Sequence, residues 1–210
     1  PMMLSQIIEQ LDAGLLCGDD ATADTRTEAI SSALALSIDS VAGQTTMLPF
    51  AIYHGARERE GMQAVFRLWE KSYDTLLKKW EYKEQEIKDD CSYLVHLDGS
   101  GARTIARRET VWKKTDVAGT SRAAIWAVCE SLQSRSDSFS GGSPQLVGLW
   151  RKGSGKHFGF FWQGKPYLGG LEVLGPRKTA ALQWFNHLFE RCDADTGRRI
   201  RSAKKHIKRA

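Results

Sequence analysis

The residues best suited to chemistry are the cations near the end of the chain. The run from Thr196 to Ala210 holds seven Lys and Arg and no Asp or Glu. Lys and Arg pair with phosphate oxygens and release the counterions that surround a nucleic acid. Other cations stand in or beside glycine-rich turns upstream. We therefore predict a nucleic-acid interface made by ten residues: Arg151, Lys152, Lys156, Lys165, Arg198, Arg199, Arg201, Lys204, Lys205 and Lys208.

The distribution of charge supports this prediction. Residues 145–210 hold 14 Lys and Arg against 4 Asp and Glu, although the net charge of the whole chain is only +5. The remaining residues are acidic overall and would repel a phosphate backbone. A solvated basic tail that binds no partner is the alternative. The sequence does not discriminate DNA from RNA.

Aromatic residues stand among the cations at 151–165. If residues 157–163 form a strand, Phe158, Phe160 and Trp162 share one face, and His157 and Phe161 share the other. Exposed aromatic rings among cations suit the stacking of bases. Small sheets also need large side chains to form a core, which is the alternative role for most of these rings.

Two acids give a second hypothesis. Asp98 ends the apolar run 92–97, and Glu109 stands in the weakly alternating segment 104–114. If these two segments form a hairpin, Asp98 and Glu109 are candidate metal carboxylates of a nuclease. An Asp-Gly turn and a surface charge are the ordinary alternatives. The His and Cys residues show no ligand spacing, and we predict no cofactor and no other metal centre.

The elements that carry the cations can be predicted from periodicity. The runs 146–151, 157–163 and 166–173 are rich in aromatic and branched residues and are separated by glycine, which predicts a three-stranded antiparallel meander. Helical spacing of apolar residues then predicts a helix within 176–192 and a basic amphipathic helix in the terminal run.

The first part of the chain is predicted to be mainly helical. Apolar residues at helical spacing predict helices at 3–16 and from about Thr25 to Ala42. Residues 56–90 keep the same spacing through Phe66, Trp69 and Trp80, which predicts a helix of roughly 45 Å. A second strand pair and a helix capped by Thr120 or Ser121 follow.

Together these elements predict an α+β protein with a mainly helical N-terminal part, a small two-stranded element, and a three-stranded meander plus C-terminal helices. The predicted domains are 2–133 and 146–210, joined by the Ser- and Gly-rich linker 134–145. We expect a nucleic-acid-binding accessory or regulatory protein rather than an enzyme. The third hypothesis is an assembly subunit that contacts a protein partner, or a second copy, through helix 56–90.

The start of the chain lacks the segments of a secretory signal, and no apolar run approaches the ~20 residues of a membrane helix. The four cysteines are scattered, which is typical of reduced thiols rather than of a disulfide framework. We therefore expect a cytoplasmic protein without a membrane partner.

Overall fold

The computed structural model describes residues 2–40, 49–60, 63–88, 92–175 and 182–206. The chain divides into two compact units, Pro1–Ile87 (unit 1) and Lys88–Ala210 (unit 2). The division falls between residues 87 and 88, and the Ser- and Gly-rich segment 134–145 lies within unit 2. No helix among the described residues is both long and apolar enough to cross a membrane.

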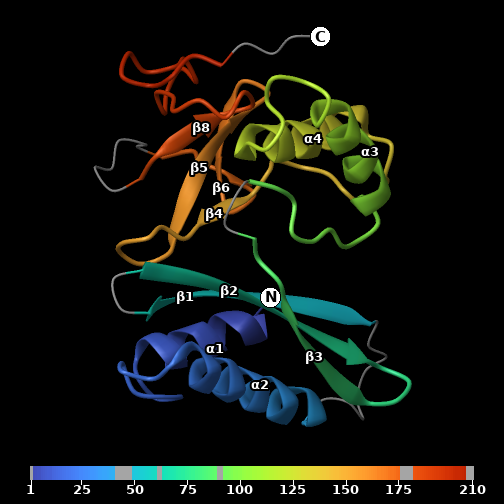
Figure 1. The fold of residues 1–210 in the computed structure, drawn as a ribbon, viewed down its shortest axis with the longest axis vertical. Helices are drawn as coiled ribbons and strands as arrows, with labels where there is room; N and C mark the ends of the chain where they lie inside the picture. Colours follow the sequence, from blue (N-terminus) through green and yellow to red (C-terminus); the bar gives the residue numbers. More distant parts are fainter. Residues whose placement is uncertain (1, 41–48, 61–62, 89–91, 176–181, 207–210) are drawn as a thin grey trace. The chain divides into compact units, whose positions relative to one another are not determined.

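Unit 1 consists of two helices on one face of a three-stranded antiparallel sheet (Figure 1). The strand order is β1-β2-β3, and each strand follows the previous one as a hairpin. The elements are α1 (Met2–Asp12), α2 (Ala23–Asp39), β1 (Phe50–Glu60), β2 (Gln63–Asp74) and β3 (Lys79–Gln85).

The core of unit 1 forms where the helices meet the sheet. Ile7 of α1 and Ile30 and Leu34 of α2 are buried together, and Ile52 and Trp80 of the sheet pack against them. Thr22 caps α2, because its hydroxyl accepts a hydrogen bond from the backbone N–H of Thr25 at 3.2 Å. Helices therefore lie where the sequence predicts the first two.

The predicted helix at 56–90 is wrong, because the described residues of this range include the end of β1 and all of β2 and β3, and none is helical. The apolar residues that suggest helical spacing are divided between both faces of the sheet. Trp69 and Tyr73 are buried on the helix-covered face, whereas Phe66 and Leu68 point to the opposite face. A protein partner can therefore no longer be predicted from a long projecting helix.

Unit 2 combines a helix pair with a five-stranded sheet. Strands β4 to β7 pair antiparallel in chain order, and β8 pairs parallel with β5. The elements are α3 (Ala102–Trp112), α4 (Ser121–Ser134), β4 (Leu146–Gly148), β5 (Lys156–Trp162), β6 (Lys165–Leu168), β7 (Leu171–Glu172) and β8 (Trp184–Asn186).

Strand β5 is the centre of unit 2. Phe158, Phe160 and Trp162 are buried in one cluster with Cys129 of α4. On the other side of the strand, Phe161 packs with the buried Trp184, Cys192 and Ala194. The alternation of aromatic side chains along β5 therefore fills two layers of core at once.

The predicted fold class is wrong in strand count and in the placement of helices. Residues 104–114, expected as a strand, lie mostly in α3, where Ile105, Glu109 and Trp112 share one face of the helix. Residues 182–192 form β8 and turns instead of a helix, and 176–181 lie outside the described residues.

The terminal run is also not helical in its described part. Residues 191–206 form turns and isolated bridges, including one between Cys192 and Arg199. Closely spaced like charges disfavour a helix here. Asp193 instead accepts hydrogen bonds from the backbone N–H groups of Asp195 and Thr196, which closes a turn. We call residues 191–206 the C-terminal coil.

Candidate functional site

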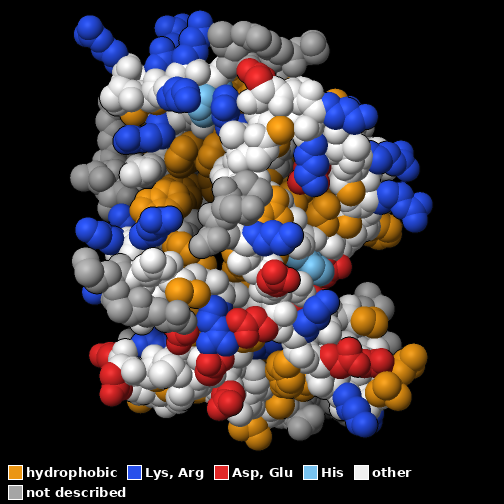
Figure 2. All heavy atoms as spheres, in the orientation of Figure 1, with side chains coloured by type: hydrophobic (Ala, Val, Ile, Leu, Met, Phe, Trp, Pro, Cys, Tyr) orange, Lys and Arg blue, Asp and Glu red, His pale blue; other side chains and the backbone are white. Residues whose placement is uncertain are grey.

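The structure divides the predicted cations between two clusters on unit 2. The loop cluster consists of Arg151, Lys152 and Lys156, in and beside the glycine-rich connection between β4 and β5. The coil cluster consists of Arg198, Arg199, Arg201, Lys204 and Lys205 in the C-terminal coil. All eight side chains are exposed. Figure 2 shows Lys and Arg side chains at several places on the visible face of unit 2.

The two clusters lie along opposite halves of β5. Lys156 begins the strand, and Gly197 packs against the ring of Phe161 near the other end. At ~3.3 Å per residue, the backbone positions of Lys156 and Phe161 are about 17 Å apart. This span corresponds to about five base pairs at a rise of ~3.4 Å. The clusters are therefore separate contact points rather than one patch.

Two of the ten predicted residues differ from the rest. The ammonium group of Lys165 is 2.8 Å from a carboxylate oxygen of Glu172, which raises the pKa of Lys165. The charge of Lys165 is therefore largely offset by the carboxylate of Glu172 on the neighbouring strand β7. Lys208 lies outside the described residues. No ion pair links the eight cations of the two clusters to any carboxylate in the described part of the chain.

The coil cluster is held by a polar framework beneath it. Glu190 is buried, accepts a hydrogen bond from Asn186 at 3.1 Å, and accepts another from the backbone N–H of His206 at 2.6 Å. A nitrogen of the His206 ring lies 2.9 Å from the carbonyl oxygen of Leu188. The framework ties the last described residue to the turn after β8. The cations between these points are presented on a fixed backbone.

Trp150 is the aromatic residue of the loop cluster. Its side chain is 47% exposed, and its ring stacks on Phe158 with 5.2 Å between the ring centroids. The absence of a side chain at Gly148 leaves space for the two stacked rings, because an added Cβ would lie 2.6 Å from the Phe158 ring and 2.8 Å from the Trp150 ring. The chain therefore presents a half-exposed aromatic ring directly beside Arg151 and Lys152.

The two acids of the nuclease hypothesis are not brought together. Asp98 precedes α3 in a loop, whereas Glu109 lies on the third turn of that helix, about 12 Å along its axis from Gly101. Glu109 is also occupied, since Lys113 lies 2.9 Å from its carboxylate. The described residues contain no group of three or more His, Cys, Asp and Glu able to hold a metal ion.

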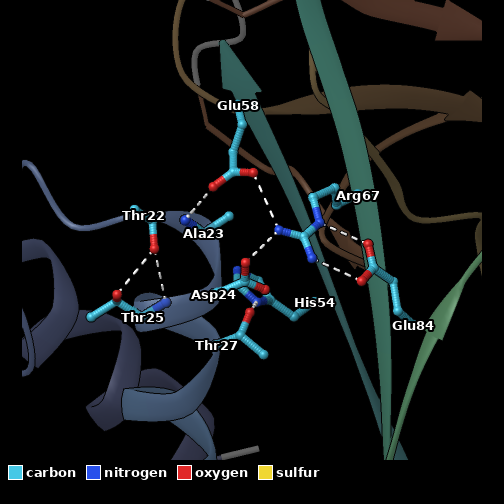
Figure 3. A network of polar contacts seen from close by, with 9 residues as sticks. All are labelled: Thr22, Ala23, Asp24, Thr25, Thr27, His54, Glu58, Arg67 and Glu84. Atoms are coloured by element: carbon cyan, nitrogen blue, oxygen red, sulfur yellow. Dashed lines mark hydrogen bonds and ion pairs between the residues drawn. The ribbon is translucent and has the colours of Figure 1, made fainter. Parts of the chain in front are cut away.

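Unit 1 contains a polar network that is not predicted from the sequence (Figure 3). The guanidinium of Arg67 on β2 contacts three carboxylates: Asp24 at 2.7 Å, Glu58 at 3.2 Å and Glu84 at 2.7 Å. The hydrogen bonds with Glu84 and Asp24 raise the pKa of Arg67 above its ordinary value. The hydrogen bond from Arg67 in turn lowers the pKa of Glu84. The network joins α2 to all three strands of the sheet.

Next to this network lie two basic groups, the half-buried His54 and the fully buried Lys71. His54 stacks on Trp69, and its Nδ1 is 2.8 Å from the Thr27 hydroxyl. Lys71 is fully buried and donates a hydrogen bond to the Thr27 carbonyl oxygen at 2.7 Å. Burial lowers the pKa of Lys71 to about 8 and, together with the charges of Lys71 and Arg26, lowers that of His54 to about 4.

A signal for this network is present in the sequence. Arg57, Glu58, Arg59 and Glu60 alternate in charge, and Trp69, Lys71 and Tyr73 follow at every second residue. Both patterns have the period of a strand. Interpreting residues 56–90 as a helix leaves both patterns unexplained.

Comparison with known proteins found no matching family, no matching curated protein and no matching solved structure.

Proposed function

We propose that this protein binds nucleic acid through the loop cluster and the coil cluster of unit 2. The observation that supports the proposal is the exposure of eight cations without a carboxylate partner among the described residues. Unit 2 holds 22 Lys and Arg against 11 Asp and Glu, whereas unit 1 holds 8 against 14. A phosphate backbone is the partner whose charge complements such a surface.

Trp150 favours unpaired bases as part of the ligand. A base that stacks on its exposed face would lie beside Arg151 and Lys152, which would contact the flanking phosphates. Stacking of this kind contributes about 1–3 kcal/mol per base and tolerates any base. The proposed ligand is therefore a single strand, or a duplex with unpaired residues, bound with little sequence preference. We also propose an accessory role for the protein. We further propose a cytoplasmic location, because Cys17, Cys129 and Cys192 form no disulfide with one another, as is usual in a reducing compartment.

The proposal is tested by neutralising each cluster in the full chain. The loop variant is Arg151→Gln/Lys152→Gln/Lys156→Gln. The coil variant is Arg198→Gln/Arg201→Gln/Lys204→Gln/Lys205→Gln. Arg199 is kept because it donates hydrogen bonds to the carbonyl oxygens of Ile200 and Ala203. Affinity for labelled single-stranded DNA and RNA is measured by fluorescence anisotropy.

The matched control is a charge change elsewhere in unit 2. Arg103, Arg107 and Arg108 are exposed on α3, and changing them to Gln removes the same charge as the loop variant. We expect both cluster variants to weaken binding by about tenfold or more and the α3 variant to weaken it much less. Equal weakening by the loop and α3 variants would show attraction by net charge alone and would reject the proposed interface.

A further inference from the structure

An open cavity of about 670 Å³ lies in unit 1 between α2 and the helix-covered face of the sheet. Its volume is typical of sites for small molecules. One wall consists of residues of α2, and the other consists of Trp69 on β2 and Tyr82 on β3. Among the described residues that line it, Asp24 and Glu28 carry carboxylates and none is Lys, Arg or His. The cavity is therefore acidic and partly aromatic.

The α2 wall is a single stripe of the helix. Asp24, Glu28, Ser31 and Ala35 line the cavity and follow one another at spacings of four, three and four residues, so their side chains leave the helix on one side. At ~1.5 Å per residue, the stripe from Asp24 to Ala35 is about 16 Å long. It begins with two carboxylates, continues with a hydroxyl and ends with a methyl group.

The sheet wall faces this stripe. Trp69 and Lys71 lie on the helix-covered face of β2, and Tyr82 of β3 pairs directly with Lys71. Directly paired residues of antiparallel strands project to the same face, so the Tyr82 ring also lies on the helix-covered face. Tyr82 is 51% exposed, and its ring stacks on Trp80 with 6.3 Å between the ring centroids. The tyrosine ring is thus held in place and is still accessible from the cavity.

Glu28 is the carboxylate of the cavity that is open to a ligand. Its side chain is exposed and forms no hydrogen bond or ion pair with another described residue. Asp24 is shared, because its Oδ2 lies 2.7 Å from Nη1 of Arg67 (Figure 3). Its other oxygen, Oδ1, accepts no hydrogen bond from the described residues. Both carboxylates therefore have an oxygen available to a cation.

The charge beside the cavity is negative even when the nearby cations are counted. Arg67 offsets only one of the three carboxylates that it contacts, and the buried ammonium of Lys71 offsets one more. Glu28 is additional, which leaves an excess of two negative charges. Arg67 also lies over the Trp69 ring, 4.6 Å from its centroid, so Trp69 contributes apolar surface and Tyr82 contributes the accessible aromatic face.

We propose that this cavity binds a linear polyamine, with ammonium groups at Asp24 and Glu28 and methylene groups along Tyr82 and Ala35. Ammonium groups are attracted to carboxylates and to the faces of aromatic rings. A chain in which charges alternate with methylene groups matches a long stripe that is acidic at one end and apolar at the other. This site lies within unit 1 and is additional to the nucleic-acid interface of unit 2.

The experiment titrates spermidine into the full-length protein at constant ionic strength and without nucleic acid. Binding is measured by isothermal titration calorimetry and located by backbone amide NMR signals. We expect one saturable site, with chemical shift changes concentrated at residues 24–35 and at Tyr82. No saturable binding, or the same shift changes with magnesium chloride, would overturn the proposal.

Two charge variants locate the site. Glu28→Gln removes the open carboxylate, should leave unit 1 folded, and should weaken spermidine binding about fivefold or more. Glu81→Gln removes the same charge from exposed β3, but Glu81 pairs with Ser72 and so lies on the opposite face of the sheet. This variant should change binding less than about twofold. Equal weakening by both variants would show attraction by net charge and contradict a localised site.

Tyr82 tests the aromatic wall. Tyr82→Phe keeps the ring and should retain the affinity, whereas Tyr82→Thr should weaken binding about threefold or more. Phenylalanine and threonine both favour strands, so β3 should persist in each variant. An unchanged affinity in Tyr82→Thr would contradict the proposed site.

A final arm distinguishes a free polyamine from a lysine side chain of a partner protein. Nα-acetyl-lysine amide carries a single ammonium on a similar aliphatic chain, and it should bind about tenfold or more weakly than spermidine. Equal or tighter binding of the lysine derivative would assign the cavity to a lysine side chain and overturn the polyamine proposal.

Discussion

The ammonium nitrogen of Lys71 lies 2.7 Å from the backbone carbonyl oxygen of Thr27, and the Lys71 side chain is fully buried. No carboxylate among the described residues forms an ion pair with this ammonium. A buried charge without an opposite charge is costly, and the cost appears as a lowered pKa. The hydrogen bond between Lys71 and Thr27 joins β2 to α2, but the buried charge of Lys71 lowers the free energy of unfolding.

Replacing Lys71 with Met should remove the pH dependence that this group gives to the stability of unit 1. The pKa of Lys71 is about 8 in the folded chain and 10.5 ordinarily, so between these values only the unfolded chain holds the proton. The free energy of unfolding therefore rises with pH there, by at most ~1.4 kcal/mol per pH unit. Below pH 8 the full penalty, about 3 kcal/mol, is present.

Urea-dependent pulse proteolysis of the full chain between pH 7.5 and 10, with cleavage in unit 1 identified by mass spectrometry, measures this slope. We expect a rising slope in the parent chain and a flat one in Lys71→Met. Lys83→Met, which changes an exposed lysine, is the control and should keep the slope. A slope that persists in Lys71→Met would show that another group causes it.

Arg67 should be the most sensitive charged residue of unit 1. Arg67→Gln leaves Asp24, Glu58 and Glu84 close together without their shared cation. Because the Arg67 side chain is only 21% exposed, we expect a loss of about 1–3 kcal/mol in the same proteolysis measurement. Arg67→Lys should not restore it, since lysine cannot form the paired contact with Glu84. Full stability in Arg67→Lys would contradict a role for this geometry.

Gly159 should be intolerant of any side chain. A Cβ at this position on β5 would lie 2.3 Å from the ring of Trp184, which is itself buried. Gly159→Ala should therefore destabilise unit 2 by about 2 kcal/mol or more, because neither the strand nor the ring has space to move. Gly141→Ala, where the added Cβ meets nothing within 4 Å, should have little effect. Equal stability of the two variants would mean that Trp184 is not seated on β5.

Trp150 should contribute to affinity through stacking. Trp150→Ala should weaken the binding of single-stranded DNA by roughly five- to fiftyfold, and Trp150→Phe should retain most of the affinity. Binding of a fully paired duplex should change little in either variant. Quenching of tryptophan fluorescence by the single strand, lost in Trp150→Phe, gives a second measurement. An unchanged affinity in Trp150→Ala would exclude the stacking role.

The contrast between β2 and β5 shows what the sequence could and could not predict. In β5 the aromatic residues and flanking glycines mark a strand whichever face is buried. On the helix-covered face of β2, Arg67 and Lys71 alternate with Trp69 and Tyr73, while Phe66 lies on the other face. Apolar residues on both faces produce spacings of three and four that imitate a helix. Only pairing with β1 and β3, which is not visible in local periodicity, determines the strand.

The same limit applies to the candidate sites. The cations of the loop and coil clusters are adjacent in sequence, so composition was sufficient to propose them. The partners of Arg67 in unit 1 come from α2, β1 and β3, which are separated in sequence and become neighbours only through folding. Predicting that network required the correct assignment of strands β1, β2 and β3.

The salt dependence of nucleic-acid affinity tests the central claim most directly. Each phosphate contact should contribute about 0.7 to the slope of log affinity against log salt on a single strand and about 0.9 on a duplex. We predict that the intact chain binds at low salt with a slope of about 2 or more and that the coil variant Arg198→Gln/Arg201→Gln/Lys204→Gln/Lys205→Gln binds with a clearly smaller slope. No binding by the intact chain at low salt, or the same slope in the coil variant, would contradict the proposed interface.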